Sequence, residues 1–293
     1  MFTLLIAVVT QSLTFLPLAL GISVAYRILR ATDMTIDGSF VLGAAVFAHF
    51  ITIGYTPAAA GLCALLAGAL AGVMVSLIQR GGRVDPLLAG VLATFILTSL
   101  NLVIMGKPNI NLLAKTTLLS GAFAHSQAAG WTLVAIYSAA FCIITCLLIS
   151  SRLGLTLRAL GDNPQLLQRL GQPIERFRCI GFALTNSLSA AAGCLTAQTI
   201  GYADVSMGFG MTLTGIGAII LGQHIVGVFI KNTSSRMISE FLAALSGVLL
   251  YFFSINALLR MDIDPVYIKM VLGLILIFFL RTATRSNAAR NSA

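Results

Sequence analysis

Residues 57–79 read PAAAGLCALLAGALAGVMVSLIQ, an apolar run that contains no charged side chain. A helix of this length is about 34 Å long, because each residue adds about 1.5 Å. The hydrocarbon core of a bilayer is about 30 Å thick, so the run predicts a membrane-spanning helix. Gly61, Gly68 and Gly72 along it are typical of a face that packs closely against another helix, although such spacing is also common by chance.

Eight further runs share this length and apolar character. They are residues 4–29, 36–54, 86–106, 130–150, 179–200, 211–230, 236–257 and 265–281. Lipid offers no partner for backbone polar groups, so each run must satisfy its own as a helix. The sequence therefore predicts an all-α integral membrane protein with about nine transmembrane helices. We expect residues 1–281 to form a single transmembrane domain and residues 282–293 a short basic cytoplasmic tail.

The composition excludes a soluble globular protein. Of the 293 residues, 58% are hydrophobic and 9% are charged, whereas a soluble domain carries roughly 25% charged residues. The net charge of +9 would suggest nucleic-acid binding in a soluble protein. No basic stripe here is interleaved with exposed aromatic residues, so we expect no nucleic-acid partner.

The basic residues instead predict an orientation in the membrane. Fourteen of the 18 Lys and Arg residues fall in the loops after the odd-numbered spans, and four fall on the other side. Cytoplasmic loops carry the excess of Lys and Arg in membrane proteins. We therefore expect the N-terminus outside and the C-terminus in the cytoplasm.

A short repeat links the two halves of the chain. Asp33-Met34-Thr35-Ile36 precedes the second span and Asp204-Val205-Ser206-Met207 precedes the seventh, each followed by a glycine-rich helix. Five spans lie between the copies, so the second copy enters the membrane from the opposite face. This pattern is typical of inverted repeats with broken helices in transporters.

The mouths of these two spans combine acids, hydroxyls and glycines. A helix start carries unpaired N–H groups and a partial positive charge, so it can hold an anion such as a substrate carboxylate. In the alternative interpretation these side chains only cap their own helices. Polar amides inside spans either line a passage or bond between helices. The candidate passage residues are Asp33, Thr35, Asp37, Ser39, Asn101, Asn186, Asp204 and Ser206.

The loop 151–178, SRLGLTLRALGDNPQLLQRLGQPIERFR, is the most charged stretch of the chain. Asp162 and Asn163 are residue types that cap a helix start, and Pro164 suits the first turn. Gly171 suits the left-handed position that ends a helix. The sequence predicts a helix of about two turns with Leu166, Leu167 and Leu170 on one face. Such a ridge either docks into a groove of another protein or rests on the lipid surface.

The segment RALGDNPQLLQRLG, residues 158–171, resembles the coupling segment of ABC-importer permeases of the branched-chain amino-acid and ribose type. Three other segments agree with the resemblance: TIDGSFVLGAA, LLAGVLATFILTSLNLVIMGKPNINLL and GYADVSMGFGMTLTGIGAIILG. Together they look like a less-characterised subgroup, some of whose binding-protein partners are associated with tryptophan or tyrosine. The resemblance covers roughly Thr32 to Leu280. It departs from the subgroup at Gln223 and His224, where an acidic residue is expected.

The resemblance implies the partners and the location of the chain. It implies a multi-pass inner-membrane permease, present as a homodimer or paired with a homologue. It also implies an extracytoplasmic substrate-binding protein and a cytoplasmic ABC ATPase that holds ATP and Mg²⁺. The coupling residues would be Arg158, Gly161, Asp162, Asn163, Pro164, Leu166, Leu167, Leu170 and Gly171.

The chain has no enzyme signature of its own. It contains no GxxxxGK[ST] phosphate loop, no HExxH and no GxSxG. We therefore expect neither an active site nor a bound cofactor or metal in this chain.

An ion-coupled secondary transporter with inverted repeats is the main alternative function. It predicts an acidic residue buried in the membrane, and the sequence does not make such a residue evident. A membrane-embedded enzyme would lack its catalytic groups here, and a structural membrane subunit stays open. We expect the substrate to be an amino acid, aromatic ones first, or a similar small solute.

Overall fold

The computed structural model describes residues 2–82, 84–229 and 236–261, together with residues 267, 270, 273 and 274. Contacts divide the chain into two compact units, which are described separately. The larger unit is Leu13–Ile216. The smaller one combines Met1–Ser12 with the described part of Gly217–Ala293.

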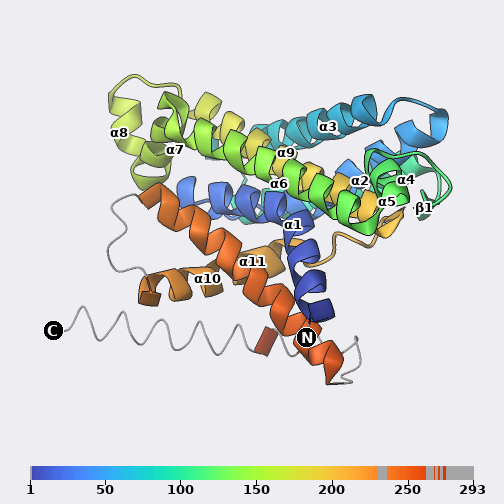
Figure 1. Ribbon diagram of the computed structural model, residues 1–293. Coiled ribbons are helices and arrows are strands. Elements are labelled where there is room, and N and C mark those ends of the chain that lie inside the picture. Colours follow the sequence, from blue (N-terminus) through green and yellow to red (C-terminus); the bar gives the residue numbers. More distant parts are fainter. Residues whose placement is uncertain are drawn as a thin grey trace. The chain divides into compact units, whose positions relative to one another are not determined.

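Nearly all of the described chain is helical (Figure 1). The helices are α1 (Phe2–Ser23), η1 (Val24–Ile28), α2 (Thr35–Ile53), α3 (Pro57–Ile78), η2 (Arg80–Gly82), α4 (Pro86–Met105), α5 (Leu118–His125), α6 (Gln127–Ser150), α7 (Arg152–Asp162), α8 (Pro164–Arg169), α9 (Ile174–Ile200), α10 (Met211–Phe229) and α11 (Arg236–Arg260). Two short strands, β1 (Asn109–Asn111) and β2 (Tyr202–Asp204), pair antiparallel.

Seven described helices are long and apolar enough to cross a membrane. They match the expected spans at 4–29, 36–54, 57–79, 86–106, 130–150, 179–200 and 236–257. The expected span at 211–230 is α10, an apolar helix that is shorter than the others in its described apolar part. Nearly all of the expected span at 265–281, and all of the tail, lie outside the described residues. The count of nine and the orientation of the termini stay predictions.

Capping residues and prolines explain where several helices begin. Thr56 precedes Pro57 at the start of α3, and its side chain accepts a hydrogen bond from the amide of Ala59. Asp85 precedes Pro86 at the start of α4 and accepts hydrogen bonds from two amides of the first turn. Proline costs nothing at these positions because its missing N–H would have no partner within the helix.

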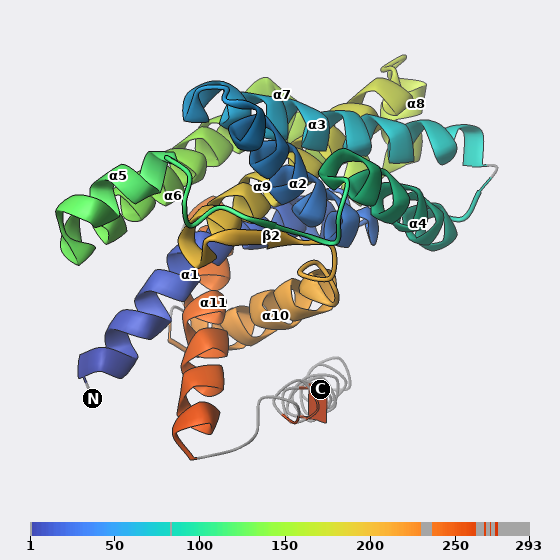
Figure 2. The same cartoon turned by 90° about the vertical axis from the view of Figure 1, so that its right-hand side faces the viewer.

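Helix α2 is the centre of the larger unit. It packs against α3, α4 and α9, and its glycine- and alanine-rich sequence is buried over most of its length (Figure 2). A Cβ atom at Gly43 would lie 2.0 Å from the carbonyl oxygen of Ala190. A Cβ atom at Gly193 would lie 1.8 Å from the carbonyl oxygen of Phe40. The backbones of α2 and α9 therefore touch, as small residues allow in membrane helix pairs.

The expected close-packing face of residues 57–79 exists and lies against α9. Gly68 faces the Asn186 carbonyl oxygen and the Ala190 side chain, whereas nothing lies within 4 Å of the space where a Gly61 side chain would be. Two of the three expected glycines, Gly68 and Gly72, thus contribute to packing within the chain. In the smaller unit α10 and α11 pack in the same way, because Gly222 lies on the backbone of Ala243 and Gly247 on that of Ala218.

Candidate functional site

A buried polar network joins the start of α2 to the middle of α9. The Asn186 side-chain amide donates to Asp33 Oδ2 at 2.8 Å, and its Oδ1 accepts from the Ser39 hydroxyl at 2.6 Å. All three side chains are buried. A buried polar group is costly unless it is hydrogen-bonded, so this network holds the three residues in one arrangement.

Three further side chains hold the carbonyl groups at the beginning of α2. Asn101 on α4 donates to the carbonyl oxygen of Gly38 at 3.1 Å. Thr94, also on α4, donates to the carbonyl of Met34 at 2.8 Å. Ser189 on α9 donates to the carbonyl of Ile36 at 2.8 Å. Asn101 and Asn186 therefore make interhelical hydrogen bonds, which is the second of the two interpretations given above.

The starts of α2 and α10 meet at Asp37. Its Oδ2 accepts from the amide of Gly210 at 3.0 Å, and its Oδ1 accepts from the amide and hydroxyl of Thr212, each at 2.6 Å. A Cβ atom at Gly208 would lie 2.4 Å from the Asp37 carbonyl oxygen. Asp37 thus caps a helix that begins more than 170 residues later in the chain. The segments directly after the two repeat copies therefore lie in contact.

Each repeat copy forms the same turn. Asp33 Oδ1 accepts from the amide of Thr35 at 2.9 Å, and Asp204 Oδ1 accepts from the amide of Ser206 at 2.7 Å. The surroundings differ, since Asp33 is buried and Asp204 is only partly buried. Hydrogen bonds from the side chain and backbone of Ser206 lower the pKa of Asp204, and the Asn109 amide, 3.2 Å from Oδ2, adds to the effect.

The amides at the two broken-helix starts therefore bind carboxylates of the chain itself. Asp33 binds the first amide of its own helix, as the capping interpretation expects, whereas Asp37 caps α10 and Asp204 binds Ser206 in the turn before α10. The opposite entry of the two copies into a membrane stays a prediction.

The loop 151–178 contains the expected short helix. Asn163 Oδ1 accepts from the amide of Leu166 at 3.1 Å, Pro164 opens α8, and Gly171 after its end has a φ of +69°. A second helix, α7, precedes α8 and was not expected. Its glycines and hydroxyl residues weaken a helix prediction, but its regularly spaced leucines are a signal that could have found it.

The expected leucine ridge is wrong in one respect. Leu167 is only 6% exposed and packs in a cluster with Val24, Ile28, Leu157 and Leu160. Leu166 and Leu170 are 50% and 64% exposed. The three leucines do not share a face, because α8 lies against α7 and η1 on the side of Leu167. The exposed apolar surface of α8 is thus the pair Leu166 and Leu170.

The end of α7 contacts the segment between α1 and α2. A Cβ atom at Gly161 would lie 2.0 Å from the carbonyl oxygen of Ile28, and Asp162 forms an ion pair with Arg30 at 2.5 Å. Asp162 therefore binds an arginine rather than capping α8. Arg158 lies on α7 and is half-buried.

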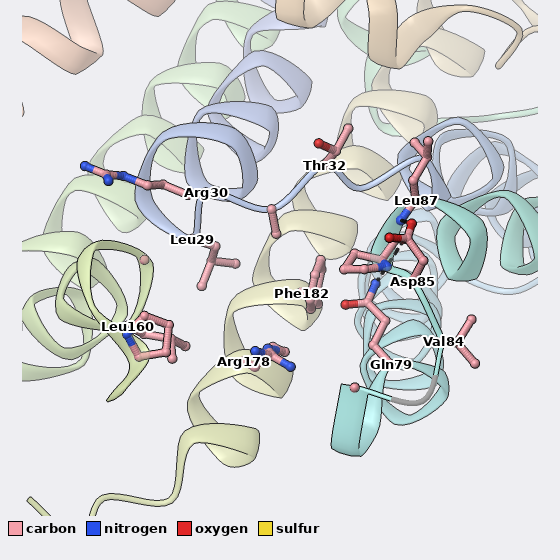
Figure 3. A pocket seen from close by; sticks show the side chains of 15 residues that line it. Leu29, Arg30, Thr32, Gln79, Val84, Asp85, Leu87, Leu160, Arg178 and Phe182 are labelled. Carbon is pink, nitrogen blue, oxygen red and sulfur yellow. Dashed lines mark hydrogen bonds between the residues drawn. The ribbon is translucent and has the colours of Figure 1, made fainter. Parts of the chain in front are cut away.

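A cleft of about 760 Å³ opens beside this contact (Figure 3). Leu160 and Pro164 form one wall, and Gln79 and Asp85 form the other. Arg178 on α9 lies between them in Figure 3. Sequence reasoning missed Leu160, Gln79 and Arg178 but had named Pro164 as a coupling residue, and the Asp85-Pro86 pair is a readable helix start. In the smaller unit, His224 Nδ1 lies 3.2 Å from the carbonyl oxygen of Ile220, and Gln223 stands beside it in sequence.

Comparison with known proteins assigns the chain to a protein family. Residues 4–280 match the family described as branched-chain amino acid transport system / permease component. The chain is 43% identical to uncharacterized protein RP368 of Rickettsia prowazekii (strain Madrid E), over 97% of this chain and 99% of that protein. It is 34% identical to a tyrosine transport system permease protein of Clostridioides difficile (strain R20291), over 95% of this chain and 90% of that protein. It is 24% identical to the ribose import permease protein RbsC of Escherichia coli (strain K12), over 73% of this chain and 66% of that protein.

The family match covers nearly the whole chain, including the loop 151–178 and both repeat copies. ABC permeases of this type are multi-pass proteins of the inner membrane, in agreement with the seven long apolar helices. The chain therefore belongs to the branched-chain amino acid transport system / permease component family, the ABC-type permeases that also include ribose-type members.

Proposed function

We propose that the chain is the permease subunit of an ABC importer for an amino acid, and that aromatic amino acids are the first substrates to test. The observation that carries the substrate class is the likeness to a tyrosine transport system permease protein over 95% of this chain. The ribose-type relative is more distant and covers less of the chain. An amino acid is therefore a better first substrate to test than a sugar.

The chain would work as one part of a larger assembly. A separate cytoplasmic ATPase would hydrolyse ATP with Mg²⁺, and a binding protein would deliver the substrate on the other side of the membrane. Two copies of this chain, or one copy and a homologue, would enclose the passage. Lipid would cover the exposed apolar helix faces, such as those bearing Leu66 and Phe95.

The structure suggests which surface the ATPase would contact. Leu166 and Leu170 are the exposed apolar pair on α8, and Arg169 stands between them in sequence. An apolar pair flanked by a cation suits a groove in a soluble partner. The Asn163 cap begins this helix and Gly171, with its positive φ, follows its end.

The secondary-transporter alternative has less support. Asp33 and Asp37, which lie among the packed helices, are occupied by hydrogen bonds from the chain itself. An ion-coupling carboxylate needs to exchange partners with the transported ion. An uptake experiment can separate the ABC importer from the secondary transporter, because only the importer requires ATP.

The test is uptake of radiolabelled tyrosine by proteoliposomes. They contain this chain together with the ATPase and binding protein that co-purify with it in mild detergent. We expect uptake that requires ATP inside the vesicle, with radiolabelled ribose as the comparison. Tyrosine uptake by the chain alone, driven by an ion gradient without ATP, would replace this proposal with the secondary transporter. ATP-driven uptake of ribose but not tyrosine would keep the importer and overturn the substrate class.

A further inference from the structure

The segment between α1 and α2 has an unusual backbone. Helix α1 ends in a π-turn, η1, in which the amide of Leu29 bonds to the carbonyl of Val24 at 2.9 Å. The amide of Ala31 then reaches back to the carbonyl of Ala25 at 3.0 Å. Arg30 has a φ of +52° and is the one non-glycine residue with a positive φ in the described chain. Such conformations are unfavourable for an L residue and concentrate where the backbone has a functional task.

The end of α7 contacts this segment at two consecutive residues. Gly161 lies so close to the carbonyl oxygen of Ile28 that there is no space for a side chain. Asp162 Oδ1 is 2.5 Å from Arg30 Nη2. Leucines 157, 160 and 167 of α7 and α8 pack around Ile28 and Leu29 in one apolar cluster. A displacement of α7 and α8 therefore has to move residues 28–30 or break all of these contacts.

The other end of the same segment enters the buried polar network. Leu29 lies against Gly181 of α9, where an added Cβ would be 2.6 Å from a leucine methyl carbon. Four residues after Leu29, the carboxylate of Asp33 is bound by Asn186 and by the amide of Thr35. The chain therefore connects the α7 contact to the start of α2 through only a few residues.

The cleft provides space for this segment to move. It separates Leu160 and Pro164 from Gln79 and Asp85, and Arg30 and Thr32 line it as well. Packed interiors resist displacement because they contain few voids. A cavity of about 760 Å³ beside a strained segment removes that resistance on one side.

We propose that Arg30 is a positioning residue for coupling: through its ion pair with Asp162 and the Ile28–Gly161 contact, movement of α7 and α8 is transmitted to Asp33 and the start of α2. This inference rests on the proposed function, because it assumes that an ATPase moves α8. It assigns a task to Arg30, Ile28 and η1, which lie outside the loop 151–178.

The ion pair can be tested by charge exchange. Arg30 and Asp162 are 55% and 48% exposed, and exposed ion pairs add little to stability. Arg30→Asp and Asp162→Arg should therefore leave the melting temperature nearly unchanged. In the reconstituted complex we expect each to lower tyrosine uptake per ATP hydrolysed by roughly fivefold or more. The double variant Arg30→Asp with Asp162→Arg should recover at least half of the lost coupling.

A control makes the same change of charge elsewhere. Arg80→Asp reverses an exposed arginine of η2, which is a separate element from α7 and from residues 28–30. If Arg80→Asp lowers uptake per ATP as strongly as Arg30→Asp, general charge explains the effect and the proposal is wrong. A double variant no better than the single ones would overturn it too.

A second measurement needs no transported substrate. In a chain without its native cysteines, Thr32→Cys places a label in the cleft. We expect its maleimide labelling rate to change when the partner ATPase is trapped with ATP and vanadate. Arg30→Asp should abolish that change while vanadate is still trapped in equal amount. An unaltered change in the Arg30→Asp variant would refute the linkage, whereas absent tyrosine uptake by the wild type would refute only the substrate assignment.

Discussion

Asn186 Nδ2 and Asp33 Oδ2 lie 2.8 Å apart in the buried network, although 153 residues separate them in the chain. Removing the donor would leave a buried carboxylate with fewer hydrogen bonds. The cost of such a loss is about 1–3 kcal/mol. We expect Asn186→Leu to lower the free energy of unfolding by that amount, measured by thermal unfolding of the purified protein.

Two variants serve as comparisons for this prediction. Asp33→Asn with Asn186→Leu removes the charge as well and should recover part of the loss. Thr196→Ala removes a hydroxyl that bonds only within α9 and should have little effect. A stability of Asn186→Leu equal to that of the wild type would show that the network does not hold α2.

Glycines in α2 and α3 should differ sharply in their tolerance of a methyl group. Gly43→Ala places a Cβ 2.0 Å from the carbonyl oxygen of Ala190, so the two helices must separate. Overpacking of this kind costs about 1–3 kcal/mol. Gly61→Ala meets nothing within 4 Å and should be neutral or stabilising, because alanine favours a helix more than glycine does. Thermal unfolding of both variants checks the contrast; equal losses would contradict the helix packing described here.

The leucines of α8 should separate folding from partner binding. Leu167→Asp buries a charge in the cluster around Ile28, so we expect a large fall in melting temperature and yield. Leu166→Asp with Leu170→Asp changes only exposed positions and should leave the melting temperature nearly unchanged. We expect this double variant to lose the co-purifying ATPase in a pull-down. Retention of the ATPase at wild-type amounts would place the docking surface elsewhere.

The orientation of the chain can be read from the labelling of single cysteines. In a chain without native cysteines, Lys115→Cys lies in the loop that we expect outside, and Gln165→Cys lies on α8. Both positions are exposed. A membrane-impermeant maleimide applied to spheroplasts should label residue 115 at once and residue 165 only after permeabilisation. The reverse order of labelling would invert the predicted topology.

Local signals in the sequence predicted local structure well. Asn163, Pro164 and Gly171 act through hydrogen bonds and backbone angles within a few residues, so their pattern predicted α8 and its ends. Apolar runs likewise predicted the membrane helices. The burial of Leu167 could not be predicted, because it depends on how α7 folds back on α8 and on η1, which is more than a hundred residues away in sequence.

The contact between the starts of α2 and α10 could not be predicted from the sequence either. The repeat suggested that residues 33–36 and 204–207 are alike, but not that Asp37 caps α10. Nothing near Asp37 in sequence indicates a partner in Gly210 or Thr212. The Arg30–Asp162 ion pair could not be predicted from the sequence either. It depends on the positive φ of Arg30, a backbone conformation that is uncommon for arginine.

The cap that Asp37 places on α10 also has a consequence for biogenesis. The amide of Thr212 is 175 residues downstream of the carboxylate that binds it. At about 5–20 residues per second, a ribosome needs roughly 9–35 s to make that stretch. During this interval the Asp37 carboxylate lacks its final partners. A carboxylate without partners is costly in lipid, so we expect the insertion machinery to shelter α2 from lipid until α10 arrives.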